Sequence, residues 1–264
     1  MARCNVPMPV TSGRSITPDI SLSYASGNGN GVCGMGWAMG VMRICRRTSN
    51  GIPHYTAEDQ FLGPDGEVLV PECNEQGEVI TRRTDIAQGI TLGETFTVTR
   101  YFPRIESAFH LLEYWEAQAG SATRPFWLLH AADGVLHCLG KTDQARIAAP
   151  DDSAKIAEWL VEESVSPFGE HIYYQYKEED NEGVNLEQDN HQYGANRYLK
   201  SIRYGNKVAS PSLYVWKGEI PADGQWLYTA ILDYGENDTS ADVPPLYVPQ
   251  GEWLARQDRF SRYD

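Results

Sequence analysis

The sequence predicts an all-β protein of antiparallel sheets joined by hairpins, sandwich-like or partly barrel-like, with few or no helices. Apolar and polar residues alternate with a period of two along its apolar segments, which is typical of half-buried strands. These segments are rich in aromatic and β-branched residues, which pack well on a pleated sheet. Combinations of Pro, Asp, Ser and Gly separate the segments and supply the turns that hairpins need.

The individual strands follow from this alternation. Each of the clearest segments places its apolar side chains on one face and its polar side chains on the other. These segments are residues 20–24, 96–101, 198–204 and 226–232.

Two hairpins follow from the turn residues. One joins residues 126–130 to residues 135–139 across Asp133-Gly134. The second joins residues 159–165 to residues 170–177 across Pro167-Phe168-Gly169. In both, a turn with glycine stands between two apolar runs, which favours antiparallel pairing.

One segment has a helical alternative. Ser153 could cap an amphipathic helix over residues 153–163. That helix would run directly into Val165 and a turn, so we expect a strand from Trp159 onward.

We expect residues 1–264 to form a single domain. The segment 178–196 is acidic, rich in Asn and Gly and without aliphatic periodicity, which predicts a surface loop or a flexible joint between two sub-sheets. Pro244-Pro245 and Pro249 predict a second extended connector.

Composition excludes several classes of function. Asp and Glu outnumber Lys and Arg by 36 to 22, giving a formal charge of -14. Nucleic acid and anionic membranes are therefore not expected as partners, since both require a basic surface. The sequence has no apolar stretch long enough to span a bilayer and no evident signal peptide at Met1.

The cysteines predict a reducing compartment during synthesis. They are odd in number and never spaced as a CxxC pair, so neither a disulfide framework nor a zinc ribbon is expected. We expect free thiols that pack as small apolar residues. The five are Cys4, Cys33, Cys45, Cys73 and Cys138.

Two glycine motifs resemble nucleotide-binding loops. The segment from Gly29 to Gly34 satisfies GxGxxG, but Gly36 and Gly40 stand where the required helix would begin, so a turn between two strands is expected. Gly140-Lys141-Thr142 resembles the end of a P-loop, yet it follows a hairpin strand and its upstream glycine has the wrong spacing. No cofactor is predicted from either motif.

Metal-binding and catalytic residues are not predicted. His130 and His137 would face each other if Asp133-Gly134 formed a two-residue turn, but a zinc site needs three or four ligands. A structural contact between the two rings is the favoured interpretation. The sequence has no GxSxG motif, and no pair of acidic residues can be singled out as acid and base. Catalytic, cofactor-binding and metal-binding residues are therefore all predicted as none.

The aromatic residues allow two interpretations. Aromatic side chains on strands usually form the core and its cross-strand pairs. They can also line a carbohydrate-binding or protein-binding face. We favour the core, with five proposed members: Trp37, Trp127, Trp159, Tyr173 and Trp226.

Several segments together resemble SpvB-type domains, and the similarity covers essentially the whole chain. The matching segments are 22–31, 34–37, 46–53, 59–70, 101–107, 126–130, 159–165, 169–174, 197–199, 204–206 and 253–258. The chain departs from the family pattern at Cys33, where members usually carry Phe. It also begins inside the first expected strand and stops at Asp264 where members continue, so a fragment of a longer toxin protein is expected.

The resemblance implies a non-catalytic module of a bacterial toxin or virulence protein. The family includes the amino-terminal part of a Salmonella plasmid virulence protein and the B components of insecticidal Tc toxin complexes. It implies delivery or encapsulation of an effector, with a covalently linked or associated effector and Rhs-associated shell components as partners. It also implies a protein secreted by bacteria or delivered to a host.

Two alternatives remain beside this interpretation. The chain resembles equally the amino-terminal part of an actin-targeting mono-ADP-ribosyltransferase virulence protein. The Glu-x-Glu pair of such enzymes is missing from this sequence, so the transferase chemistry is not carried over to this chain. The second alternative is a carbohydrate- or surface-binding β module.

Overall fold

The computed structural model describes residues 2–106, 108–179 and 194–234. Beyond residue 234 it gives only the backbone of four two-residue strands, β19 (Asn237–Asp238), β20 (Leu246–Tyr247), β21 (Ala255–Arg256) and β22 (Arg262–Tyr263). About 49% of the chain is strand and 5% helix, and the strand pairs are antiparallel. The predicted all-β class with few helices is thereby confirmed.

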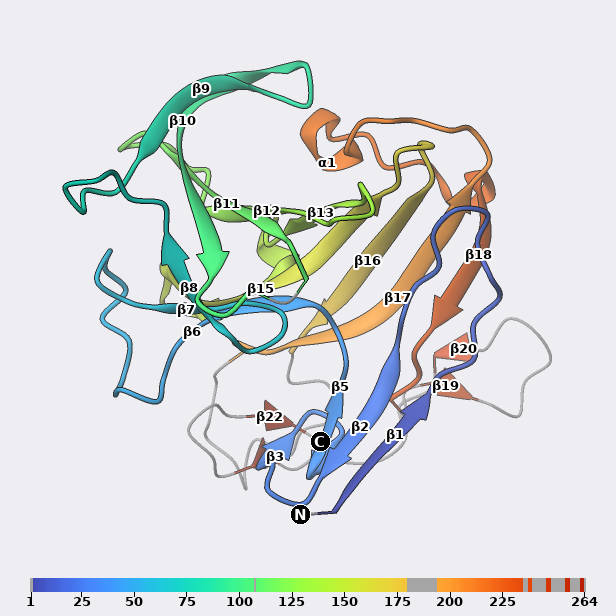
Figure 1. Cartoon of the computed structure of the whole chain (residues 1–264). Helices are drawn as coiled ribbons and strands as arrows, with labels where there is room; N and C mark the ends of the chain where they lie inside the picture. The colour runs from blue at the N-terminus through green and yellow to red at the C-terminus, as the bar shows by residue number, and fades with distance from the viewer. Residues whose placement is uncertain are drawn as a thin grey trace.

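Eight strands close into a barrel (Figure 1). Each strand pairs antiparallel with its neighbours, and the pairing of β13 with β15 closes the ring. Closure removes the free edges that an open sheet would present. In order around the ring the strands are β6 (Arg43–Arg46), β7 (Phe61–Leu62), β8 (Val68–Pro71), β10 (Ile90–Pro103), β11 (Leu111–Ala117), β12 (Phe126–His130), β13 (Leu136–Leu139) and β15 (Asp152–Val165).

An aromatic core fills the barrel. All eight strands contribute to it, and Trp127 and Trp159 have no exposed surface. The ring of Phe61 lies at its centre, with its centroid 5.1 Å from that of Trp127 and 5.7 Å from that of Trp159. Such edge-on aromatic pairs stabilise a core beyond their buried area.

The barrel sheet continues beyond β15 into three further strands. These are β16 (His171–Glu178), β17 (Arg197–Asn206) and β18 (Trp226–Ile231), paired antiparallel in chain order. A separate sheet of β1 (Arg3–Pro7), β2 (Ser21–Ala25) and β5 (Trp37–Met39) lies near them (Figure 1). A second apolar cluster, which includes Ile20, Leu199 and Ile202, joins the N-terminal segment to this extension.

The remaining elements are short or attached to barrel strands. β9 (Thr81–Ala87) pairs with β10, and β14 (Arg146–Ala149) pairs with β15. β3 (Asn30–Gly31) and β4 (Gly34–Met35) form a small hairpin. The helical elements are α1 (Tyr214–Lys217), η1 (Asp143–Ala145) and η2 (Asp223–Gln225).

Both predicted hairpins are present. β12 pairs with β13, and β15 pairs with β16. The helical alternative over 153–163 is excluded, because this whole segment belongs to β15. Its last seven residues, from Trp159 to Val165, are all buried, since the strand has the barrel core on one face and other elements on the other.

Four of the five proposed core aromatics are buried: Trp127, Trp159, Tyr173 and Trp226. Trp37 is only half-buried, so its prediction was wrong. It lies on the small N-terminal sheet rather than in the barrel, where its ring packs against Tyr24 with centroids 5.3 Å apart.

The cysteines differ in part from the prediction. All five are free thiols, but only Cys138 is buried as a small apolar residue, while Cys4 and Cys73 are exposed. Cys4 is exposed because it lies on β1, an edge strand whose residues are all exposed.

The predicted joint at 178–196 falls mostly on residues 180–193, which lie outside the described residues, as does the connector at Pro244-Pro245 and Pro249. No helix in the described ranges is both long and apolar enough to cross a membrane.

Candidate functional site

The two glycine motifs have structural roles in the fold. The GxGxxG segment forms the β3–β4 hairpin, as the predicted turn between strands requires, with Gly34 at a φ of 97°. Gly140 follows β13, and the Lys141 ammonium that follows it lies over three aromatic rings. Its Nζ is 4.4 Å from the centroid of Phe126, 4.9 Å from that of Trp216 and 5.4 Å from that of Phe96.

His130 and His137 do not face each other. The hairpin bonds run from Ala131 N–H to the Val135 carbonyl, and His130 pairs with Leu136 instead of His137. The loop therefore has three residues, with Gly134 at a φ of 86°. This shifts the register by one residue and puts the two rings on opposite faces of the sheet.

The two ends of the barrel differ. At one end Arg46 and Asp59, both almost fully buried, form an ion pair with Nη1 and Oδ2 2.9 Å apart. Arg46 also donates from Nε to the carbonyl of Ile156 and lies over the ring of Phe61. The ion pair, packed against the aromatic core, closes this end of the barrel.

The other end is hollow. We call this cavity, of about 590 Å³, the barrel-mouth pocket. Along β15, Ile156 lies at the Arg46 end and Ser164 lies at the pocket. Its walls come from the N-terminal segment, β15, β16 and the β12–β13 loop, and include Ser15, Asp19, Met42, Asp133, His137 and Tyr174.

Three polar side chains in the pocket contact one another. His137 Nδ1 lies 2.7 Å from Ser164 Oγ, and Ser164 also hydrogen-bonds Tyr174. Burial lowers the pKa of His137 to about 4 and raises the pKa of Tyr174 to about 12. All three groups are therefore neutral at physiological pH.

A serine beside a histidine invites comparison with a hydrolytic triad. A triad needs a carboxylate that hydrogen-bonds the histidine and orients it as the base. Within the described ranges, no carboxylate makes such a hydrogen bond to His137. The nearby Asp133 instead accepts the N–H of Val135 within the hairpin loop, at 3.0 Å. Ser164 and His137 are therefore better placed to hydrogen-bond a molecule than to act as a nucleophile and its base.

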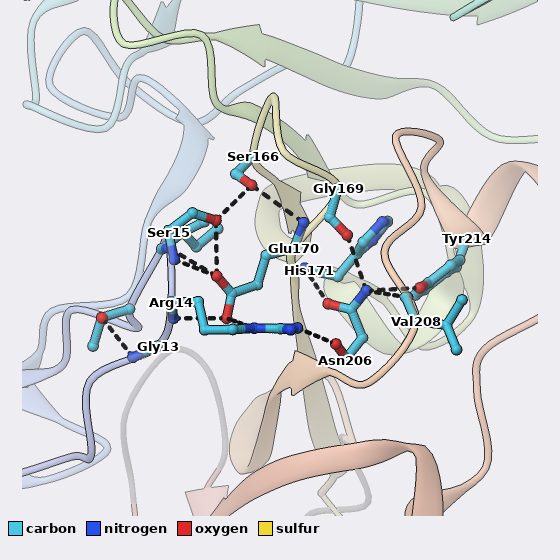
Figure 2. Close-up of polar contacts among 12 residues, drawn as sticks. Gly13, Arg14, Ser15, Ser166, Gly169, Glu170, His171, Asn206, Val208 and Tyr214 are labelled. Atoms are coloured by element: carbon cyan, nitrogen blue, oxygen red, sulfur yellow. Dashed lines mark hydrogen bonds and ion pairs between the residues drawn. The ribbon is translucent and has the colours of Figure 1, made fainter.

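Glu170 fixes the N-terminal wall of the pocket (Figure 2). Its carboxylate accepts the N–H of Arg14 at 2.9 Å, the N–H and hydroxyl of Ser15, and the N–H of Ile16 at 3.3 Å. Burial alone would raise the pKa of Glu170, but these donors outweigh it and lower the pKa. The segment is thus held on the sheet by a charged acceptor in the β15–β16 turn.

A second polar cluster lies beside Glu170. The Asn206 amide donates to the carbonyls of Gly169 and Val208 and to the Tyr214 hydroxyl, and its oxygen accepts the N–H of His171 (Figure 2). One buried side chain therefore joins the β15–β16 turn, β17 and the segment that leads to α1.

Glu163 attaches α1 to the barrel. It accepts the N–H of Tyr214 at 2.7 Å and the N–H of Val215 at 3.1 Å, supplying the cap that Leu213 cannot provide. No group of three or more metal-binding side chains occurs within the described ranges.

Sequence reasoning did not identify these polar groups. Glu170 lies more than 150 positions from the segment that it binds, and no local motif marks such a pair. The only sign of these groups in the sequence was the pair of predicted hairpin turns, which places Asp133 and Glu170 at the ends of strands.

Comparison with known proteins identifies relatives over the full length. The family model described as "Salmonella virulence plasmid 65kDa B protein" (SpvB) matches residues 1–264. The curated mono(ADP-ribosyl)transferase SpvB of Salmonella typhimurium is 45% identical, and the alignment covers 100% of this chain and 44% of that protein. The chain thus spans less than half of this relative.

Solved structures agree with this result. The N-terminal domain of effector protein SpvB from Salmonella typhimurium strain LT2 matches with a TM-score of 0.86 and 42% identity, covering 99% of this chain and 83% of that one. The crystal structure of TcdB2-TccC3-Cdc42 matches with a TM-score of 0.88 and 43% identity, covering 100% of this chain and 12% of that one. These matches confirm the resemblance found in the sequence.

Proposed function

The chain belongs to the SpvB family, and from this premise we propose that it is a non-catalytic structural module of a bacterial toxin or virulence protein. In this role it supports the delivery or encapsulation of a separate effector. The effector would be linked covalently or held by associated shell components, and the whole protein would be delivered to a host.

One observation carries this proposal. The same fold, at similar identity, occurs in the N-terminal domain of SpvB and in a chain of the TcdB2-TccC3 complex, of which it makes up only 12%. A module that accompanies such different proteins is better suited to a shared scaffolding role than to a reaction specific to one of them.

The geometry supports the same role. The closed barrel has an aromatic core, a buried ion pair at one end, and N-terminal and α1 segments fixed by buried carboxylates. Such an assembly is rigid and presents fixed surfaces. Among the described residues, no carboxylate hydrogen-bonds His137 to orient it beside Ser164. This argues against hydrolysis by the pair.

A second proposal concerns the parent protein. Identity of 45% over the whole chain to a mono(ADP-ribosyl)transferase favours a parent that carries such an enzyme in a part that this chain does not cover. The resemblance to the virulence protein implies actin as the target of that enzyme. The absence of a Glu-x-Glu pair from the chain agrees with that division.

A labelling assay tests the non-catalytic role. The purified chain is incubated with biotinylated NAD and host-cell extract, with full-length SpvB as the positive control. We expect labelled protein only with the control. Labelling by the chain itself would refute the proposal.

A further inference from the structure

The barrel-mouth pocket has the size and position of a ligand site. Its volume of about 590 Å³ lies within the range of small-molecule pockets, roughly 300–1,000 Å³, and the mouth of a β-barrel is a common position for them. The opposite end of the same barrel is closed by Arg46 and Asp59. The two ends thus differ, and the pocket end leaves space above the core.

The pocket walls are held in place by hydrogen bonds within the protein. The carboxylate of Glu170 binds the backbone of Arg14 and Ser15, and the Ser15 hydroxyl lies 2.8 Å from that of Ser166. The β12–β13 loop is fixed by its own hydrogen bonds, including Asp133 to the Val135 N–H. A preformed site loses little conformational freedom on binding.

The charges of the residues that line the pocket indicate the class of ligand. None of the described residues that line the pocket is Lys or Arg, so an anion would find no opposite charge there. Asp19 and Asp133 are exposed, while His137, Ser164 and Tyr174 are neutral. A cation bound beside these neutral groups would lose its hydration without a buried counter-charge, which is costly.

The groups that remain suit a neutral molecule with many hydroxyls. Hydroxyl, imidazole and phenol groups both donate and accept hydrogen bonds. Apolar walls, including Val41, Met42 and Val161, offer contacts for C–H groups. His137 uses Nδ1 for Ser164, and the structure records no partner for its Nε2 in the described part of the chain.

We propose that the barrel-mouth pocket binds a neutral, hydroxyl-rich small molecule of monosaccharide or disaccharide size, with His137, Ser164 and Tyr174 as its polar contacts. This inference is independent of the scaffolding role. A failure to bind sugars would leave the labelling assay unaffected, and a labelled product would leave sugar binding unaffected.

The test is saturation-transfer NMR with the 264-residue chain and a matched series of probes at millimolar concentration. Glucose and maltose are neutral, glucosamine is cationic, and glucuronate is anionic. We expect transfer to at least one neutral sugar and much weaker transfer to the two charged analogues. Absence of transfer to both neutral sugars, or equal transfer to a charged analogue, would overturn the proposal.

Two variants locate the binding. His137→Phe keeps a ring but removes both nitrogens, and should weaken binding about tenfold. The matched control is His130→Phe, on the neighbouring strand and the opposite face, which should leave binding unchanged. Tyr174→Phe, which removes only the phenol hydroxyl, should also weaken binding and serves if His137→Phe fails to fold. Unchanged binding in a folded His137→Phe variant, or in Tyr174→Phe where that variant replaces it, would overturn the assignment.

Discussion

Glu163 Oε1 lies 2.7 Å from Nδ1 of His171, and both side chains are completely buried. The other ring nitrogen of His171 faces the carbonyl of Ser210. The Tyr214 ring stacks on the imidazole with centroids 3.8 Å apart. Because Glu163 also caps α1, this pair joins the barrel strand β15, the extension strand β16 and the helix in one contact.

We predict that Glu163→Ala lowers the free energy of unfolding by about 3–5 kcal/mol. The substitution leaves a buried imidazole and two helical N–H groups without their acceptor. Urea unfolding followed by circular dichroism measures the change. The matched control is Glu158→Ala on the same strand, whose partner Arg43 is exposed and which should cost less than about 1 kcal/mol. Equal losses in the two variants would contradict the assigned role.

Glu113 should make stability depend on acid pH. Burial alone would raise the pKa of Glu113, but the neighbouring His130 and Arg82 side chains lower it to about 2. A carboxyl whose pKa falls on folding stabilises the native state above its unfolded value, and this contribution is lost as pH falls through the folded value. The window is therefore from about pH 4.5 down to about pH 2.

The expected contribution of Glu113 is about 1–2 kcal/mol, because Arg82 is half exposed and solvent screens the pair. Unfolding free energies of the wild-type chain and Glu113→Gln, measured across that window, should converge as the pH falls. A constant difference between the two proteins would show that Glu113 has no such role.

Gly140→Ala should destabilise the barrel by about 2–4 kcal/mol. Gly140 has a φ of 66°, and an added Cβ would overlap the ring of Trp159 in the aromatic core. Gly120→Ala is the control, since Gly120 has a φ of 92° but no atom within 4 Å of the added carbon. That variant carries only the backbone strain, about 1–2 kcal/mol. Thermal unfolding of the two variants separates the cost of the overlap with Trp159 from the cost of the backbone strain.

The thiols should react in a definite order. Cys4 and Cys73 are exposed and should react quickly with a maleimide. Burial raises the pKa of Cys45 to about 11 and raises that of Cys138 well above its ordinary value, so both should react slowly. Mass spectrometry of partly labelled protein reads the order. Early labelling of Cys138 would mean that the barrel wall opens.

The local parts of the fold could be predicted from the sequence. The β12–β13 and β15–β16 hairpins depend on neighbouring residues, and their turns contain Gly134 and Gly169 at positive φ. The register of the first hairpin was missed, because Asp133-Gly134 fits both a two-residue and a three-residue loop. One residue of loop length decides whether His137 meets His130 or points into the pocket.

The non-local parts could not be predicted. Barrel closure depends on the pairing of Leu136 with Val165, which no periodicity specifies. The contact of Glu170 with Ser15 spans 155 positions. The pocket exists only where these distant segments meet, so residue patterns along the chain gave no sign of it.

The size of the natural protein tests the central claim most directly. An immunoblot of the producing bacterium with an antibody against this chain gives that size. A structural module of a toxin should appear in a band at least tens of kilodaltons heavier than the 29.6 kDa of the chain, with a far larger band if it is part of a toxin shell. A band near 29.6 kDa would contradict the account, because the chain would then be neither linked to an effector nor part of a larger shell protein.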